Sequence, residues 1–216
     1  MSFVLPLSSG CGTLSTARPL EPGQHEVGIT LGGAIVDIGA PIPIPNAVIE
    51  GRSGITEVLD RPLDINYGLN ATALAFGILQ GHVGMSWLLA PQNKGVPAVS
   101  FTERTWWASN ALGLPWREDK RATFWGAQQF EVDVSWEISN QILYVGLAQY
   151  IDFGVPELAL TPVLGATFDP GKEAGLRLHL EMKWWAINQP HVYDGVTWVP
   201  DSFGAIGVHM GLSYKL

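Results

Sequence analysis

Hydrophobic and polar residues alternate along most of this chain with a period of two, and the last fourteen residues show it most clearly. One face of the stretch 203–216 carries large apolar side chains: Ile206, Val208, Met210, Leu212, Tyr214 and Leu216. The opposite face is small or polar. Strict alternation with one apolar face predicts a β-strand. The stretch is longer than the five or six residues common in soluble strands, and it fits a tilted strand that crosses a bilayer, which needs about 9–11 residues.

The same pattern recurs upstream, separated by segments rich in Gly, Pro, Asn and Asp. The predicted strands cover residues 26–36, 47–55, 63–73, 82–90, 98–109, 124–138, 142–153, 158–168, 176–187 and 203–216. Prolines in APIPIPN, after the first strand, predict a stiff extended loop because proline cannot donate to a strand ladder. In the fifth strand Glu103 falls in phase with Val99 and Phe101, and a β-bulge would restore the phase.

The strand count and the connections between strands predict the architecture. About ten strands are expected, within a range of eight to twelve, and single-chain bacterial barrels have an even number. Connections after the second, fourth, sixth and eighth strands are mostly short, whereas those after the fifth and ninth are long. Short turns on one side and long loops on the other are typical of membrane barrels. We therefore predict an all-β protein that forms an antiparallel up-and-down transmembrane β-barrel.

Composition agrees with this architecture. Hydrophobic residues make up 47% of the chain and charged residues only 15%, below the roughly 25% of ordinary soluble domains. No run of about 18 apolar residues exists, which excludes helical membrane spans. Apolar residues distributed by alternation instead give a membrane barrel its outer surface. The net charge is −8 and no basic cluster is present, so nucleic acid is not an expected partner.

Two segments resemble bacterial outer-membrane β-barrel proteins. The chain ends with Tyr214 two residues before an apolar terminal residue, which resembles the C-terminal assembly signal of that family, with Leu216 where Phe is usual. The phrase SGITEVLDRPLDINYGL resembles the strand–turn–strand units of such barrels. This resemblance implies a location in the bacterial outer membrane, contact with membrane lipid and possible contact with other envelope proteins.

The first 23 residues do not show the strand pattern. MSFVLPLSSGC resembles the end of a bacterial lipoprotein signal, in which the cysteine, here Cys11, becomes lipidated. The alternative is a lone cysteine in an N-terminal tail. The residues that follow are polar and predict a flexible tether. We therefore expect a signal remnant and tether over residues 1–23 and a barrel over residues 24–216.

Alternation alone does not say which face points outward. A soluble lipocalin-like barrel would bind a ligand inside an apolar cavity, whereas a membrane barrel is apolar outside. The polar faces here contain Gly, Ala and Ser between the charges, which suits a confined lumen, and lysine is scarce. Aromatic residues near strand ends on the apolar faces are candidates for the membrane girdle: Trp87, Trp136, Trp184 and Tyr214.

The polar faces supply the candidate lumen-lining residues: Glu50, Arg52, Asp64, Asn66, Glu131, Asp133, Glu137, Arg177, His179, Glu181 and Lys183. In a shared lumen, acids from the strand 124–138 could reach bases from the strand 176–187. Charges in a low dielectric must be paired, so such a set predicts a charge-paired plug. The alternative is a narrow channel for small polar solutes. Open channels are typical of barrels with about 16–18 strands, so a barrel of about ten strands favours the plug.

Catalytic signals are weak. His191 with Asp194, and His209 with Ser213, could belong to an outer-membrane hydrolase, but no catalytic motif surrounds them. The five histidines lie on different elements without metal-ligand spacing, so neither a metal nor another cofactor is expected. The sequence thus favours a non-enzymatic outer-membrane barrel with a structural role or a role in an envelope assembly. A channel, a hydrolase and a soluble ligand-binding barrel are the alternatives.

Overall fold

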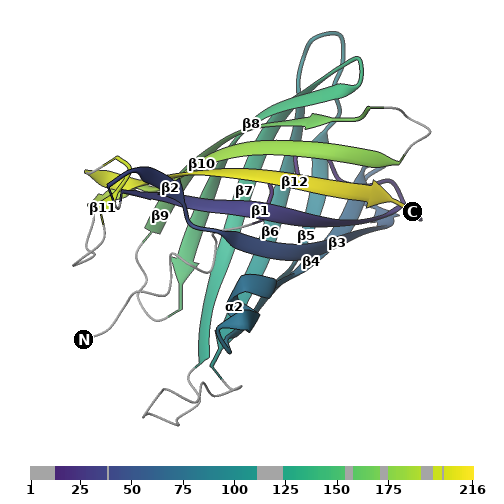
Figure 1. The fold of residues 1–216 in the computed structure, drawn as a ribbon. Coiled ribbons are helices and arrows are strands. Elements are labelled where there is room, and N and C mark those ends of the chain that lie inside the picture. The colour runs from purple at the N-terminus through teal and green to yellow at the C-terminus, as the bar shows by residue number, and fades with distance from the viewer. Residues whose placement is uncertain are drawn as a thin grey trace.

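The protein is a closed antiparallel β-barrel (Figure 1). A computed structural model describes residues 13–37, 39–110, 124–153, 158–170, 175–190, 197–200 and 202–216. Ten long strands form the wall: β1 (His25–Asp37), β3 (Asn46–Glu57), β4 (Pro62–Asn70), β5 (Leu79–Ala90), β6 (Ala98–Ser109), β7 (Phe124–Ile138), β8 (Gln141–Asp152), β9 (Leu158–Phe168), β10 (Leu176–Pro190) and β12 (Phe203–Lys215).

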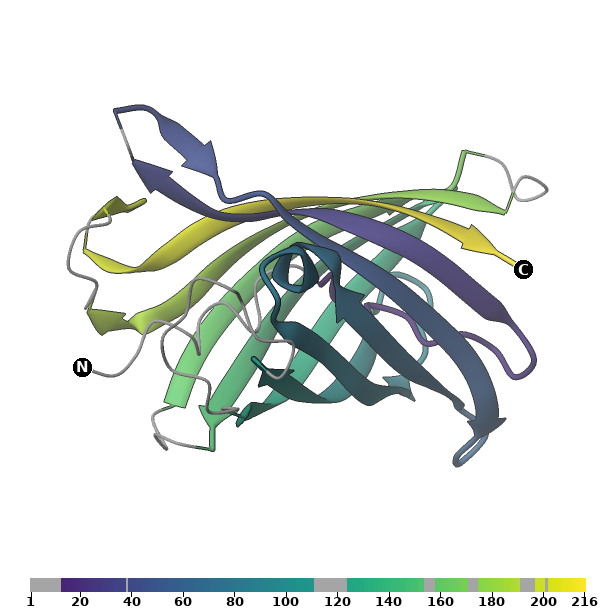
Figure 2. The same ribbon diagram turned by 60° about the horizontal axis from the view of Figure 1, so that its bottom comes forward.

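The first and last long strands close the wall. β1 pairs along one edge with β12 and along the other with β3, so that Ile29 lies opposite both Leu212 and Ile49. Every other long strand pairs with its neighbours in the chain. Figure 2 shows the strands curving into this wall. The sheet therefore has no free edge among its long strands, which a barrel needs to satisfy its backbone in a membrane.

Side chains alternate between an apolar exterior and a polar interior. In β6 every second residue is buried, and Ser100 and Thr102 on the lumen side are fully enclosed. On the outer side, large hydrophobic residues stay exposed, with Val132 at 43% and Met210 at 54%. This is the reverse of a soluble barrel, which hides its apolar side chains inside. The predicted fold class, a transmembrane-type barrel with apolar residues outward, is confirmed.

Small elements at the barrel ends differ from the sequence prediction. The third predicted strand was extended to Ala73, but β4 stops at Asn70 and a short helix, α2 (Ala71–Ala75), follows. The Asn70 side chain accepts a hydrogen bond from the Ala73 backbone and caps this helix, which ends the strand. The proline-rich segment, expected to be a loop, contains a short strand, β2 (Pro41–Pro43). With β11 (Thr197–Trp198) it pairs with the end of β1.

Glu103 needs no bulge. β6 keeps its register with β7 throughout, and Glu103 lies on the outward side between Met85 and Phe130. The register shifts lie elsewhere, between Gly54 and Thr56, between Leu88 and Ala90, and between Trp185 and Pro190.

The barrel has two distinct ends. The short-turn end carries the start of β1, the end of β12 and the connections β3–β4, β5–β6, β7–β8 and β9–β10. The long-connection end carries α2, β2, β11 and the remaining connections. In the described part of the chain, no helix is long and apolar enough to cross a membrane.

The segment before β1 lies inside the barrel. We call residues Thr13–Gln24 the strap. Thr13, Thr16 and Leu20 are at most 2% exposed, and the strap hydrogen-bonds to several strands of the wall. The sequence instead predicted a flexible tether here. Its polar composition does not indicate disorder, because the lumen that surrounds it is polar too. The lipid-attachment prediction for Cys11 lies outside the described residues.

Candidate functional site

The strap enters the lumen at the short-turn end, where it is held against β3. Gly23 donates its backbone N–H to the Gly54 carbonyl (3.0 Å), and Gly54 donates back to the Gln24 carbonyl (2.9 Å). The backbone passes so close that a Cβ on Gly54 would lie 1.9 Å from the Glu21 carbonyl oxygen. Only glycine permits this approach without displacing the strap.

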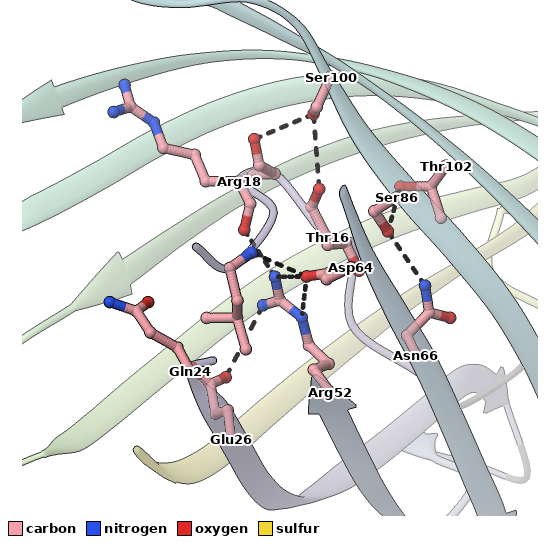
Figure 3. Close-up of polar contacts among 12 residues, drawn as sticks. Thr16, Arg18, Gln24, Glu26, Arg52, Asp64, Asn66, Ser86, Ser100 and Thr102 are labelled. Carbon is pink, nitrogen blue, oxygen red and sulfur yellow. Dashed lines mark hydrogen bonds and ion pairs between the residues drawn. The ribbon is translucent and has the colours of Figure 1, made fainter. Parts of the chain in front are cut away.

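A group of charges near the short-turn end, the basal cluster, holds the part of the strap nearest β1, and Figure 3 shows three of its members, Glu26, Arg52 and Asp64. The basal cluster consists of Glu26, Arg52, Asp64 and Arg177. Arg52 donates to Asp64 Oδ2 (2.7 Å) and to the carbonyl oxygen of Arg18 in the strap (2.6 Å). The same Asp64 oxygen accepts the backbone N–H of Leu20 (2.9 Å). Wall charges thus pair with one another and with the strap backbone at once.

Glu26 joins the two arginines of the basal cluster. Its carboxylate lies 3.0 Å from Arg177 and 3.8 Å from Arg52. Glu26 is on β1, and the arginines are on β10 and β3, so the cluster spans the seam where the first and last strands meet. Buried charges need such partners because an isolated ion in a low dielectric is very costly.

A second group of charges, the central cluster, lies deeper in the lumen and hydrogen-bonds to the first part of the strap, residues 13–16. It consists of Arg104, Glu131, Glu181 and Lys183, and each of these is at most 3% exposed. Arg104 pairs with Glu131 (3.1 Å), and Lys183 pairs with Glu181 (3.1 Å). Two cation–carboxylate pairs, one from β6 and β7 and one from β10, therefore face the lumen together.

The strap connects the two pairs of the central cluster. Ser15 donates its backbone N–H to Glu181 (2.8 Å) and its hydroxyl to Glu131. Arg104 donates to the Leu14 carbonyl (3.1 Å) and the Thr16 hydroxyl (2.8 Å). Polar atoms of the strap thus form the hydrogen bonds that the wall ion pairs leave unmade. A buried polar network is stable only when its members are satisfied in this way.

Further wall residues complete the network. Tyr144 donates its hydroxyl to Glu181 (2.8 Å), and Gln129 donates its side-chain amide to Glu131 (2.8 Å). Trp106 donates to Gln129 (2.9 Å) and is buried in the lumen. These bonds fix the orientation of both glutamates.

The short-turn mouth is partly open beside the strap. Arg18 pairs there with Glu137 (2.8 Å) and also contacts Gln92. A cavity of about 530 Å³ lies next to these residues and is also lined by Lys94 and Glu21. Because Arg18 and Glu137 are partly exposed, water screens the attraction between their charges more than it screens the enclosed pairs of the central cluster.

Most of the residues predicted to line the lumen lie on the inner side of the wall. Those that are buried are Asp64, Asn66, Glu131, Asp133, His179, Glu181 and Lys183. Glu50, Arg52 and Arg177 lie on the lumen side and are half-buried, whereas Glu137 is exposed at the mouth. Both carboxylate oxygens of Asp133 lack a hydrogen-bond partner among the described residues.

The pairing differs from the one expected. Acids of β7 were expected to reach bases of β10, but Glu131 pairs with Arg104 of the adjacent β6, and Lys183 pairs with Glu181 of its own strand. Arg104 was not among the predicted residues. Its signal was present, because Ala98, Ser100, Thr102 and Arg104 share one phase. Glu26 carried the same kind of signal, because it is in phase with Gly28 and Thr30 on the small face of its strand, whereas the strap carried none.

The histidines do not form the arrangement considered for catalysis. Ser213 lies 2.7 Å from His179 Nε2, and Thr167 lies 3.0 Å from His179 Nδ1. His209, the partner considered for Ser213, has no hydrogen bond at either ring nitrogen among the described residues and contacts Trp185 edge-on. His191 and Asp194 lie outside the described residues. Within the described ranges, no group of three or more His, Cys, Asp or Glu side chains could hold a metal ion.

The aromatic girdle candidates face outward near both ends. Trp87, Trp136 and Tyr214 lie toward the short-turn end, and Trp184 lies toward the other. Trp184 donates to the Phe203 carbonyl (3.0 Å), and Trp87 donates to the Val58 carbonyl (3.2 Å). Their apolar rings thus adjoin the outer surface while their N–H groups are satisfied.

Comparison with known proteins gives a likeness in fold alone. No protein-family model matches the chain, and no curated protein matches it. Among solved structures, the translocator domain of the autotransporter NalP from Neisseria meningitidis aligns with TM-score 0.46 and 8% identity, covering 97% of this chain and 92% of that one. A porin aligns with TM-score 0.37 and 10% identity (91% and 60%).

A third solved structure is Ail, the attachment invasion locus protein of Yersinia pestis. It aligns with TM-score 0.28 and 10% identity, covering 90% of this chain and 99% of that one. All three are outer-membrane β-barrels. The β-barrel class of this chain rests on its own geometry: a closed antiparallel wall with an apolar exterior and a charged interior.

Proposed function

We propose that this protein is a bacterial outer-membrane barrel whose lumen is closed by its own N-terminal strap, and that it serves as a structural component of the envelope. The observation that carries the proposal is that side chains of both lumen clusters hydrogen-bond to the strap. Arg52, Asp64, Arg104 and Lys183 each bond to the strap backbone, from four different strands.

The size of the barrel explains why a strap fits inside it. About eight strands make a lumen that side chains alone can fill, and 16 or more leave a water channel. A ten-strand wall falls between these limits, and the strap occupies the additional space. An extended segment also brings backbone N–H and C=O groups to the wall charges, which must be hydrogen-bonded when buried.

Conductance in planar lipid bilayers tests the closed state. The purified full chain should give no regular current steps, whereas a variant that lacks residues 2–22 should give them. The deletion variant must first show the boiling-dependent gel shift of a folded barrel, so that a silent, unfolded sample is not misread. Regular steps from the full chain at the frequency of the deletion variant would overturn the closed barrel.

A narrow channel with the strap as its gate is the second candidate. Asp133 and His209 favour it, because both are fully buried on the lumen side without hydrogen-bond partners among the described residues, as groups beside a hydrated path would be. If the full chain conducts, Asp133→Asn should change its cation-to-anion selectivity, with Val132→Ile, the outward neighbour on the same strand, as the control. Unchanged selectivity would argue against a path past Asp133.

The location has its own test. After cell fractionation, the protein should be found in the outer-membrane fraction and should migrate differently on a gel when boiled. Recovery in the soluble fraction would contradict the proposal, whatever the conductance.

A further inference from the structure

Four polar side chains lie on the outward surface of the barrel, three to five residues from the nearest strand end: Glu103, Thr105, Gln128 and Gln149. They lie on the adjacent strands β6, β7 and β8. Elsewhere on the described strands, outward positions away from the ends are apolar or glycine, apart from Ser53, which bonds to the first residue of β1. We call these four residues the outer polar patch.

The strand register places the outer polar patch compactly. Glu103 pairs with Phe130, which pairs with Gln149, and Thr105 in the next outward row pairs with Gln128. Glu103 is also near the middle of β6, about 15–20 Å along the strand from either end at 3.3 Å per residue. The neighbouring Val83 and Met85 of β5 are 53% and 47% exposed, so the patch faces the same surroundings as the apolar band.

Bonds within the outer polar patch satisfy part of its capacity. Gln128 donates its amide to Glu103, and Thr105 Oγ1 lies 3.2 Å from Glu103 Oε1 and 3.0 Å from Gln128 Oε1. A carboxylate accepts about four hydrogen bonds and an amide donates two, so capacity remains on both. In hydrocarbon such groups are costly, because lipid tails offer no partner.

We propose that the outer polar patch is an interface within the membrane, where a second copy of this chain docks about a two-fold axis. The patch is self-complementary, because it combines the acceptor Glu103 with the amide donors Gln128 and Gln149. A two-fold axis brings the same patch to both sides, so each carboxylate meets donors of the partner. Phe101 and Phe130, stacked with ring centroids 6.3 Å apart, add apolar contact beside it.

Disulfide cross-linking in native outer membranes tests the interface. In a Cys11→Ser background, Phe130→Cys places a thiol on β7 in the centre of the patch, and Met210→Cys places one on β12, four strands away in one direction and six in the other. Two cysteines form a disulfide only when their Cα atoms approach within about 7 Å. We expect a covalent dimer of this chain from Phe130→Cys after mild oxidation and none from Met210→Cys.

A second variant separates contact from chance collision. Glu103→Leu combined with Gln128→Leu removes the polar bonds and should lower the cross-linked fraction about tenfold, as expected for the loss of a few membrane hydrogen bonds. The boiling-dependent shift should persist, because both positions face outward. Equal cross-linking at both thiols, no dimer from Phe130→Cys, or cross-linking to a different protein would each overturn the second-copy interface.

Discussion

Lys183 Nζ donates a 2.8 Å hydrogen bond to the carbonyl oxygen of Thr13, which lies 170 positions earlier in the chain. The contact joins one of the last strands of the wall to the first described residue of the strap. Lys183 is fully buried and is also paired with Glu181. A single ammonium group thus pairs with a carboxylate of the wall and also holds the strap backbone in place.

The Arg104–Glu131 pair should contribute strongly to stability. Arg104→Ala leaves the buried Glu131 carboxylate without its cation, and breaking such a pair costs about 3–5 kcal/mol. Arg61→Ala is the matched control, because Arg61 lies in the turn between β3 and β4. Urea unfolding in lipid vesicles, followed by tryptophan fluorescence, measures both. A loss for Arg104→Ala no larger than that of the control would contradict the enclosed pair.

The strap should shield its residues from reagents in solution. In a Cys11→Ser background, Thr16→Cys should react slowly with a water-soluble maleimide, because Thr16 is 2% exposed. Glu21→Cys, at an exposed position of the same strap, should react rapidly. Labelling rates followed by mass spectrometry give the comparison. Similar rates at the two positions would show that the strap lies outside the lumen in solution.

The contact at Gly54 should control where the strap leaves the barrel. A Cβ at this position would lie 1.9 Å from the Glu21 carbonyl, so Gly54→Ala must displace the strap, at a cost of about 1–3 kcal/mol for overpacking. Ile55→Val, one residue later and 52% exposed, is the control. Combined with Thr16→Cys, the Gly54→Ala variant should speed maleimide labelling. An unchanged rate would indicate that the strap tolerates the added methyl.

The outward side of β12 should not tolerate a charge. Met210→Arg places a guanidinium on the apolar surface, where arginine near the bilayer midplane costs about 2–4 kcal/mol. Lys215→Arg, at the end of the same strand, keeps the charge and should have little effect. Folding yield into vesicles, read from the boiling-dependent gel shift, measures both. Equal yields would argue that this surface does not face lipid.

Local pattern alone determined the wall. Period-two alternation fixes which residues share a face, and the long strands from β5 to β9 follow the predicted segments closely. The apolar-outward orientation could also be inferred, because the opposite face carries Gly, Ala and Ser between its charges and lysine is scarce. Arg104 could also have been predicted from its phase in β6. Glu103 obscured this signal, because it places a charge on the otherwise apolar face of the same strand.

Only the tertiary structure decided the contents of the lumen. Which charges pair depends on strand register and tilt, and neither is encoded in the alternation of a single strand. The strap has no alternation, because its partners surround it on several sides and come from strands far apart in sequence. Ser15, for example, contacts Glu131 and Glu181, which are 116 and 166 positions away. The sequence of a polar segment does not say whether it is a tether or a plug. The closed, charged wall that surrounds the segment decides this.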